Sequence, residues 1–494
     1  MGVFDDTRKE LQSDKEQALE RAGLGEIGKI KYTQDDIGRA QRFSGKHKDD
    51  VRWCQERKNW FIWNGKVWEQ DRTLKIMMLA KNVINDIIID CLEASRKATD
   101  VDQQAAAEKR LKEAFKNKSE RTLKAMLELS KSELPILASE FDANPFLLNC
   151  QNGVIDLKTG KLKKHDAKLY CSKICNAEFD PKAEPDLFQK FLQLITCEDE
   201  ELELYLNQVV GMAALGKVFY EGLCIFYGAG SNGKSTFLNC IRKVLGDYSG
   251  TLNPEIMMMQ RNGQQPAGLA DISGRRFVTA IETEEGKRLS GAVLKQLSST
   301  DPITARRLYE NPITFEPTHT LIMATNFLPK IGSTDMGTWR RIKVVPFDAE
   351  IKGKQVKDYA TVLYEADKDA ILSWVVLGAN MYIANDMNIE APEAVEEATK
   401  EYRQSEDWAS NFIMEYCDIG KDFEARGGEL YDRYKEWCEA NSEYRRRPRD
   451  FAAGLEVKGL EKRKTQKGMI WRGIRLKEEN SFKTVREPHP WVKD

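Results

Sequence analysis

Leu223-Cys-Ile-Phe-Tyr-Gly-Ala-Gly-Ser-Asn-Gly-Lys-Ser-Thr236 is the stretch that decides the fold of this chain. Its apolar start predicts a buried parallel strand, which runs into a glycine-rich turn and a helix beginning near Lys234. Gly228, Gly233, Lys234 and Ser235 match the G-x-x-x-x-G-K-[ST] pattern of a phosphate-binding P-loop. Glycines permit the tight turn, whose free N–H groups then face an anion together with the helix N-terminus. Lys234 would add a positive charge at the phosphates, and the Ser235 hydroxyl would be a Mg²⁺ ligand.

The same residues also fit a second pattern. Gly228, Gly230 and Gly233 spell G-x-G-x-x-G, and Asp247 follows at about the distance that a dinucleotide-binding fold requires. In that fold the acidic residue ends a second strand, whereas the sequence around Asp247 predicts a helix end and a loop. The P-loop interpretation is therefore favoured. Its predicted nucleotide-binding residues are Gly228, Ala229, Gly230, Ser231, Asn232, Gly233, Lys234, Ser235 and Thr236.

Length and composition restrict the possible fold and function only loosely. The 494 residues are enough for about three domains, and the net charge of −2 argues neither for nor against a nucleic-acid partner. No apolar run is long enough to span a membrane, and the N-terminus lacks the apolar core of a signal peptide. The ten cysteines stand singly, without a C-x-x-C pair, and there are four histidines. This usage predicts reduced, buried thiols in a cytoplasmic protein and makes a zinc site improbable.

The N-terminal part is predicted to be a charged arm (1–34) followed by a mixed α+β domain (35–187). Aromatic residues between Trp53 and Trp68 predict a hairpin with an Asn64-Gly65 turn. Basic residues lie among them, so the cluster either stacks on single-stranded bases or, as is more common, forms a small hydrophobic core. Residues 74–132 have helical spacing, and residues 152–162 predict a second hairpin.

Three further elements follow the P-loop helix. The strand predicted at 275–282 ends in Glu282 and Glu284, where an acid would hold the Mg²⁺ shell or orient the attacking water. Another buried strand ends in Asn326, which would position water at the γ-phosphate or cap a turn. Between them, residues 303–315 predict a hairpin with Arg306, Arg307 and Tyr309 on or near its projecting end.

Two adjacent arginines, Arg340 and Arg341, precede a strand predicted to run to Phe347. An arginine donated to a neighbouring subunit's nucleotide stabilises the charge of the transition state, and a surface-exposed basic pair is the alternative. Two helices, 356–365 and 370–384, are predicted to pack under this core. An acidic stretch at 390–401 then marks the boundary to a C-terminal domain (389–494).

The C-terminal domain has the outline of a winged helix. Helices are predicted at 429–441 and 451–458, followed by a basic hairpin at 460–476. Its charge cluster is typical of phosphate contacts, with a solvated face or a subunit contact as the alternative. The predicted DNA-binding residues are Arg445, Arg446, Arg447, Arg449, Lys462, Arg463 and Lys464.

In this order, the motifs resemble the phage and plasmid replicative helicases of superfamily 3, in their D5-like (P4-type) branch. The resemblance covers most of residues 35–476. The segments that carry it are Asn152-Gly-Val-Ile-Asp-Leu-Lys-Thr-Gly160, the P-loop, Glu282-Thr-Glu284, Lys295-Gln-Leu with Ile303-Thr-Ala-Arg306, Ala324-Thr-Asn326, Trp339-Arg-Arg-Ile342 with Val345-Pro-Phe347, and Trp471-Arg-Gly-Ile-Arg-Leu476.

The resemblance implies an α/β fold, with an AAA+-like P-loop ATPase core (188–388) between the mixed N-terminal domain and the winged helix. It implies ATP and Mg²⁺ as cofactors, and a ring, usually a hexamer, that translocates on single-stranded DNA and unwinds forked DNA. Lys234 and Ser235 would bind phosphate and Mg²⁺, Glu282 would be the Walker B carboxylate and a Mg²⁺ ligand, and Asn326 the sensor. Arg341 would be the arginine finger, with Arg340 as the close alternative. The hairpin tip around Arg306, Arg307 and Tyr309 would line the central channel and grip DNA.

The family's two adjacent acids are here separated as Glu282-Thr-Glu284, so which of them polarises water stays open. No primase fits before Asp35, which implies a separate primase or initiator protein. The implied setting is replication of a phage, plasmid or other mobile element in the cytoplasm of a bacterial host. Two other functions are consistent with the motifs: a P-loop ATPase that binds or remodels origin DNA without processive unwinding, and a non-catalytic replication scaffold.

Overall fold

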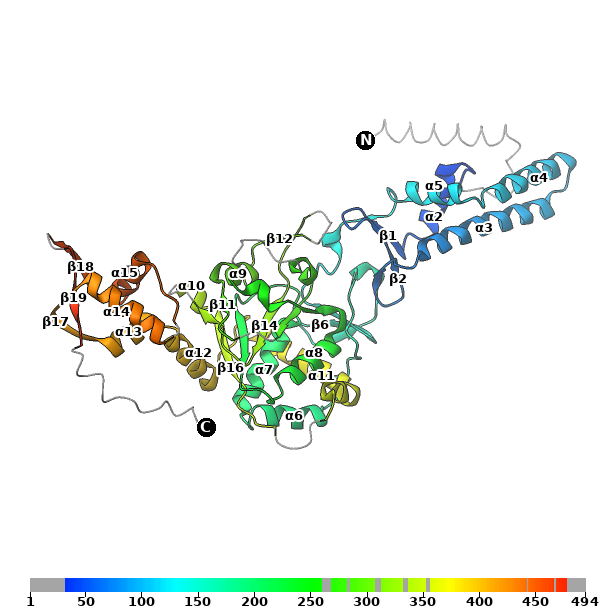
Figure 1. Ribbon diagram of the computed structural model, residues 1–494. Helices are drawn as coiled ribbons and strands as arrows, with labels where there is room; N and C mark the ends of the chain where they lie inside the picture. The colour runs from blue at the N-terminus through cyan, green and yellow to red at the C-terminus, as the bar shows by residue number, and fades with distance from the viewer. Residues whose placement is uncertain are drawn as a thin grey trace, which may run out of the picture. The chain divides into compact units, whose positions relative to one another are not determined.

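The computed structural model describes residues 32–259, 268–281, 285–306, 312–331, 336–351, 356–441, 443–465 and 468–477 (Figure 1). The chain forms two compact units. The first comprises the residues up to Glu184 together with Lys243–Tyr248 and Lys368–Val376, and the second comprises Pro185–Arg242, Ser249–Asp367 and the residues from Leu377 onward. None of the helices in the described ranges is both long and apolar enough to cross a lipid bilayer.

The first unit begins with helices around a small sheet, whose strands are ordered β3-β2-β1-β4. The predicted aromatic hairpin is confirmed, because Trp63 of β2 pairs with Trp68 of β3. Trp60, Phe61 and Trp68 are buried, so this cluster is a hydrophobic core. The elements are α2 (Asp36–Lys46), β1 (Val51–Cys54), β2 (Asn59–Trp63), β3 (Trp68–Gln70), α3 (Lys75–Lys97), α4 (Val101–Lys116), α5 (Glu120–Ser130) and β4 (Pro135–Ile136).

The helical stretch predicted at 74–132 is divided into three helices. The side chains of Asp100 and Ser119 accept hydrogen bonds from backbone N–H groups in the first turns of α4 and α5, which marks two new helix starts. The second predicted hairpin is also present, with β6 (Gly153–Asp156) pairing antiparallel with β5 (Leu147–Cys150) and β7 (Lys161–Lys163).

The second unit contains a five-stranded parallel sheet in the order β16-β8-β14-β10-β9. Because all the strands point the same way, their carboxyl ends share one edge of the sheet, which we call the carboxyl edge. The strands are β8 (Leu223–Tyr227), β9 (Ser249–Thr251), β10 (Phe277–Ile281), β14 (Thr320–Thr325) and β16 (Ile342–Pro346).

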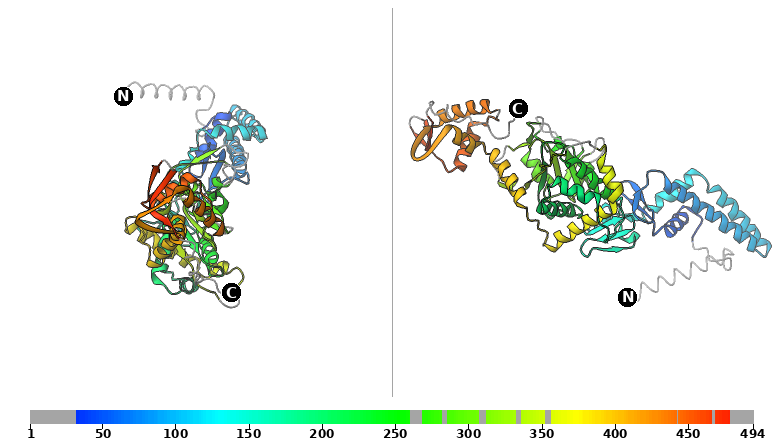
Figure 2. Two further views of the ribbon diagram at one scale, coloured as in Figure 1. Left: turned by 60° about the vertical axis from the view of Figure 1, so that its left-hand side comes forward. Right: turned by 90° about the horizontal axis from the view of Figure 1, so that it is seen from below.

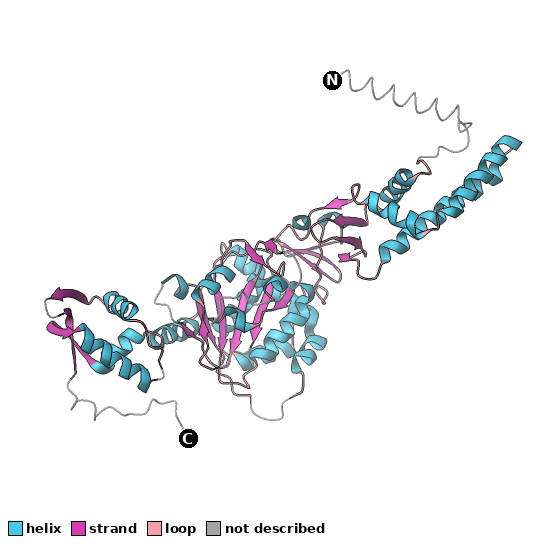
Figure 3. Cartoon of the chain, turned by 45° about the horizontal axis from the view of Figure 1, so that its top comes forward, coloured by secondary structure: helices cyan, strands magenta, loops and turns pink. Residues whose placement is uncertain are grey.

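Helices cover both faces of this sheet (Figure 3). On one face, Leu223 and Ile225 of β8 join a core that includes Leu294 of α9 (Gly291–Leu297). On the other, Phe226 packs against Phe237 of α8 (Lys234–Leu245). Successive residues of β8 therefore serve opposite faces, as a strand requires. The remaining helices of this core are α6 (Leu187–Ile195), α7 (Glu200–Ala213), α10 (Met336–Trp339) and α11 (Tyr359–Ala384).

The helices predicted at 356–365 and 370–384 correspond to two helical segments of α11, which meet at a kink where Asp367 leaves helical geometry. The dinucleotide alternative is excluded by topology, because Asp247 lies in a 3-10 turn (Gly246–Tyr248) and the strand after it, β9, is at the far edge of the sheet. A dinucleotide fold would place that strand next to β8.

The predicted boundary at 390–401 is a helix, α12 (Glu393–Ser405), rather than a free linker. It packs on the edge strand β16, where the Val344 N–H donates to Thr399 Oγ1 at 2.9 Å. The C-terminal region then follows, orange to red in Figure 2. Its elements are α13 (Trp408–Tyr416), β17 (Cys417–Arg426), α14 (Gly427–Ala440), α15 (Pro448–Val457), β18 (Glu461–Thr465) and β19 (Gly468–Leu476).

The sheet of this region is ordered β17-β19-β18 and packs with its three helices around a core that includes Phe412, Tyr434 and Trp471. Helices α14 and α15 and the basic hairpin β18–β19 agree with the prediction. Strand β17 was not predicted, because its exposed residues alternate with half-buried ones and carry no apolar run.

Candidate functional site

The turn between β8 and α8, Gly228–Gly233, is called the glycine loop below. Three of its residues have positive φ: Gly230 at 104°, Ser231 at 50° and Gly233 at 85°. Gly228 is required for a different reason, because a Cβ there would lie 2.2 Å from both Asn232 Nδ2 and the Phe347 carbonyl oxygen. Glycines thus provide both the left-handed backbone and the close approach that this turn needs.

Lys234, the first residue of α8, has its ammonium group turned into the glycine loop. Its Nζ donates to the Gly228 carbonyl oxygen and to Asn232 Oδ1, both at 2.8 Å, and to Asn326 Oδ1 at 3.2 Å. Only 4% of the residue is exposed, and this burial lowers its pKa from 10.5 to about 8. Among the described residues its three hydrogen-bond acceptors are neutral oxygens, so an anion bound beside them would favour the charged form of the ammonium group.

The carboxyl edge of the sheet collects the other members of the site. Asn326 directly follows β14, the neighbour of β8, and so reaches Lys234. Asn232 Nδ2 donates to the carbonyl of Phe347, which directly follows β16, at 2.8 Å. Ser235 is exposed in the first turn of α8, where a hydroxyl is accessible to a cation. Lys234, Asn326 and the glycine loop, which the sequence predicted as parts of one site, therefore lie together in the structure.

The predicted acids Glu282 and Glu284 lie outside the described residues. The strand before them, β10, ends at Ile281 on the carboxyl edge. Strand β14 separates β10 from β8, so the two strand ends are about 10 Å apart at the usual strand spacing.

The two adjacent arginines, Arg340 and Arg341, have different surroundings. Arg341 is buried: its Nη1 donates to the Gly337 carbonyl at 2.8 Å, and its Nη2 pairs with Glu221. Arg340 has 69% of its side chain exposed and lies 3.9 Å from the same carboxylate. Both precede β16, so they are at the sheet edge opposite the glycine loop, about 17 Å away along a five-residue strand.

The hairpin that carries the first DNA-binding candidates is present, with β12 (Ile303–Ala305) pairing antiparallel with β13 (Ile313–Phe315). Arg306 follows β12 and is exposed. Arg307 and Tyr309 lie outside the described residues, so the structure does not describe the tip itself.

The C-terminal cations divide into one buried residue and a larger exposed group. Arg446 is a correction to the prediction: it is 8% exposed, and its guanidinium lies 4.6 Å from the centre of the Trp408 ring, so it belongs to the domain core. Lys462 pairs with Glu456 of α15 at 2.5 Å. The exposed candidates are Arg445, Arg447 and Arg449 before and at the start of α15, and Arg463 and Lys464 on β18.

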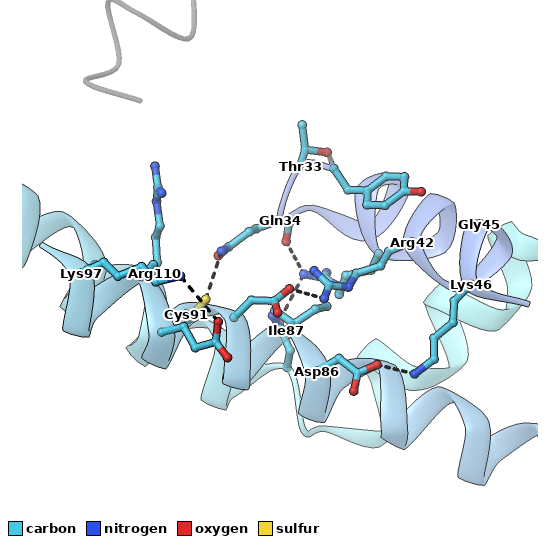
Figure 4. Close-up of a pocket in the computed structure, with 18 residues that line it drawn as sticks. Thr33, Gln34, Arg42, Gly45, Lys46, Asp86, Ile87, Cys91, Lys97 and Arg110 are labelled. Atoms are coloured by element: carbon cyan, nitrogen blue, oxygen red, sulfur yellow. Dashed lines mark hydrogen bonds and ion pairs between the residues drawn. The ribbon is translucent and has the colours of Figure 1, made fainter. Parts of the chain in front are cut away.

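A cavity of about 590 Å³ lies in the first unit, between α2, α3 and α4 (Figure 4). Two ion pairs cross it from α2 to α3, one between Arg42 and Asp90 and one between Lys46 and Asp86. Its charged walls are thus largely paired with each other, and this cavity contains none of the predicted site residues.

Two members of the site were missed from the sequence. Glu221 precedes β8 and neutralises Arg341, and the Phe347 carbonyl fixes Asn232. Neither has a sequence signal, since one is a single acid in a loop and the other is a backbone group. Both depend on the pairing of β16 with β8.

Comparison with known proteins finds similarity to viral proteins that are named as putative helicases and putative primases. The family model described as "D5 N terminal like" matches residues 40–197, and a family of unknown function matches residues 226–341. "Putative helicase L207/L206" of Acanthamoeba polyphaga mimivirus is 28% identical over 331 residues, covering 62% of this chain and 34% of the relative. "Putative primase C962R" of African swine fever virus (isolate Warthog/Namibia/Wart80/1980) is 25% identical over 389 residues, covering 71% and 39%.

"Putative helicase 022R" of Frog virus 3 (isolate Goorha) is 28% identical over 258 residues, covering 47% of this chain and 26% of the relative. The chain therefore spans about a quarter to two fifths of the length of these curated relatives. A solved structure titled "The apo structure of NrS-1 C terminal region (305-718)" aligns with 12% identity and a TM-score of 0.44, covering 78% of this chain and 81% of that one.

Proposed function

We propose that this chain, which is similar to viral proteins named as putative helicases and putative primases, is an ATP-dependent DNA helicase of superfamily 3 that acts in DNA replication. In this proposal the second unit contains an AAA+-like P-loop core and a C-terminal winged helix. The observation that carries the proposal is the buried ammonium group of Lys234, which donates to the glycine loop and to Asn326 at the carboxyl edge.

The residues at the carboxyl edge fit a nucleoside triphosphate. Lys234 would bind the β- and γ-phosphates, the glycine loop would surround them with N–H groups, and Ser235 with Glu282 would hold Mg²⁺. ATP supplies the phosphoryl group whose transfer to water drives the motor. Asn326 would orient that water, while Glu282 or Glu284 would accept its proton.

The arginine positions support a shared site. An arginine about 17 Å from its own glycine loop cannot act in cis, but it is available to the nucleotide of an adjacent subunit. Because Arg341 is buried against Glu221, we assign the finger to the exposed Arg340 and a structural role to Arg341. A trans-acting arginine requires a closed assembly, for which we propose a ring, most simply a hexamer.

DNA would bind at two places in this proposal. The β12–β13 hairpin with Arg306 would line the channel of the ring and grip one strand. The order α13, β17, α14, α15, β18, β19 is that of a winged helix, in which α15 and the β18–β19 hairpin approach DNA. The exposed cations Arg445, Arg447 and Arg463 lie beside these two elements and would contact phosphates.

Strand displacement on a forked duplex tests this function. The wild type should hydrolyse ATP and separate the strands, and Lys234→Ala should abolish both activities while the protein stays folded. Arg340→Ala should bind nucleotide without hydrolysing it. Mixing this variant with Lys234→Ala should restore part of the activity, because some subunit interfaces then combine an intact Lys234 with an intact Arg340. DNA-stimulated hydrolysis without strand displacement would instead indicate an ATPase that binds or remodels origin DNA. A wild type without ATPase activity would refute both functions.

A further inference from the structure

Residues 443–447 lie between α14 and α15 and are called the coupling loop here. Some of its side chains are exposed and one is buried in the C-terminal core. Arg445 and Arg447 are exposed, whereas Arg446 is buried against Trp408. The backbone is also anchored, because the Tyr434 hydroxyl donates to the Tyr444 carbonyl at 3.1 Å and the Tyr431 hydroxyl to that of Arg446 at 2.8 Å. Two candidate DNA-binding arginines are therefore mounted on a segment that is fixed to the C-terminal core.

The first two residues of the coupling loop contact the ATPase core of the same unit. Glu443 Oε1 accepts an ion-paired hydrogen bond from Lys330 Nζ at 2.9 Å. The Arg288 guanidinium lies 4.2 Å from the centre of the Tyr444 ring, which is a cation–π contact. A third contact adjoins these two, since Glu406 accepts the Ile331 N–H at 2.6 Å.

These contacts all reach one small ribbon. Arg288 belongs to β11 (Arg288–Leu289) and Lys330 to β15 (Lys330–Ile331), and the two strands pair in parallel with these residues as partners. The ribbon is short and charged, and the cations Arg288, Lys330 and Arg446 alternate there with the carboxylates of Glu406 and Glu443.

The ribbon is also close in sequence to the candidate catalytic residues. Strand β15 begins four residues after Asn326, which contacts Lys234. Strand β11 begins seven residues after Ile281, where β10 ends at the carboxyl edge. A shift of these strand ends during nucleotide binding or hydrolysis would therefore have only a short stretch of chain to cross before it reached Arg288 and Lys330.

We propose that the β11–β15 ribbon and the coupling loop form a relay that links the nucleotide state of the core to DNA binding by the C-terminal domain. This inference rests on the proposed function and specifies its regulation. Glu443 and Tyr444 adjoin Arg445 and Arg447 in a five-residue segment, so the DNA-facing arginines cannot move without the ribbon contacts moving too. Coupling is reciprocal: nucleotide changes DNA affinity by the same factor by which DNA changes nucleotide affinity.

The test compares two carboxylates of the same domain in the full-length protein. Glu443→Gln keeps the size of the side chain but removes the charge that binds Lys330. Glu436→Gln is the matched control, because Glu436 pairs with Arg433 within α14, at 2.8 Å, and not with the core. The measurements are ATPase rates with and without single-stranded DNA, and DNA affinity with and without a non-hydrolysable ATP analogue.

Basal ATPase should be unchanged in both variants. The ratio of DNA affinities with and without nucleotide should fall about two- to fivefold in Glu443→Gln, the range of a partly exposed ion pair, and stay at the wild-type value in Glu436→Gln. Exchanging the charges, with Lys330→Glu and Glu443→Lys together, should restore most of the ratio. The relay would be overturned if the ratio of DNA affinities were the same in the wild type and in Glu443→Gln. It would also be overturned if this ratio fell equally in Glu443→Gln and Glu436→Gln. Either result would leave the helicase function intact. A wild type with no ATPase activity would overturn both.

Discussion

Nucleotide binding should draw a proton onto Lys234 at mildly alkaline pH. In the nucleotide-free structure burial lowers the pKa of this ammonium group to about 8, and its three hydrogen-bond partners are neutral oxygens. Phosphate oxygens beside it would return the pKa to the ordinary value near 10.5 or above, because an opposite charge favours the protonated form. Lys234 is therefore partly deprotonated before binding and fully protonated after it.

The expected proton uptake follows from these two pKa values. It is about 0.1 proton per site at pH 7, about 0.5 at pH 8 and about 0.9 at pH 9. The lowered pKa of Lys234 also means that its burial destabilises the nucleotide-free fold. The cost is about 3 kcal/mol below pH 8, where Lys234 is charged in both the folded and the unfolded state. This destabilisation decreases as the pH rises from 8 towards 10.5, since the unfolded chain then binds more protons than the folded one.

Isothermal titration calorimetry with a non-hydrolysable ATP analogue measures this uptake. The observed heat is plotted against the ionisation enthalpy of several buffers at each pH, and the slope is the number of protons taken up. Lys234→Arg is the matched control, because a guanidinium keeps its charge throughout this range and should give a slope near zero. A wild-type slope near zero from pH 7 to pH 9, or the same slope in both proteins, would refute the reasoning.

The other predictions concern the arginine pair, the glycine loop and the basic hairpin. Arg341→Ala should destabilise the fold by about 1–3 kcal/mol, because it leaves the Glu221 carboxylate without its buried partner. Arg340→Ala should change the stability by no more than about 0.5 kcal/mol. Equal melting temperatures of the two variants would contradict the structural role assigned to Arg341. Gly228→Ala should weaken binding of a fluorescent nucleotide at least about tenfold, since its Cβ would displace the loop; unchanged anisotropy titrations would show that the loop tolerates it. Lys464→Ala should make the slope of log DNA affinity against log salt concentration less negative by about 1. An unchanged slope would mean that Lys464 contacts no phosphate.

Local sequence pattern accounted for most of the individual elements. The glycine loop with Lys234, the strand that ends at Asn326 and the basic hairpin β18–β19 were all predicted, because each depends on residues close together in the chain. Short-range rules were less reliable where a long-range contact provides the stabilisation. The acidic stretch predicted as a domain boundary at 390–401 lies largely in α12, which packs on the edge strand β16 through Thr399.

Other decisions required the tertiary structure. The order of the sheet strands excluded the dinucleotide alternative, since five parallel strands can be arranged in many ways that share the same local pattern. Arg340 and Arg341 are identical in type and adjacent in sequence, and only the position of Glu221 makes one buried and the other exposed. Burial of Arg446 likewise depends on Trp408, 38 residues away in the chain. The sequence by itself determined where the glycine loop forms and which local segments carry charge, because spacing governs the geometry of a single turn or helix. Which charges face solvent, and which are paired inside the fold, was decided only by chain packing, because burial depends on residues that the sequence keeps far apart.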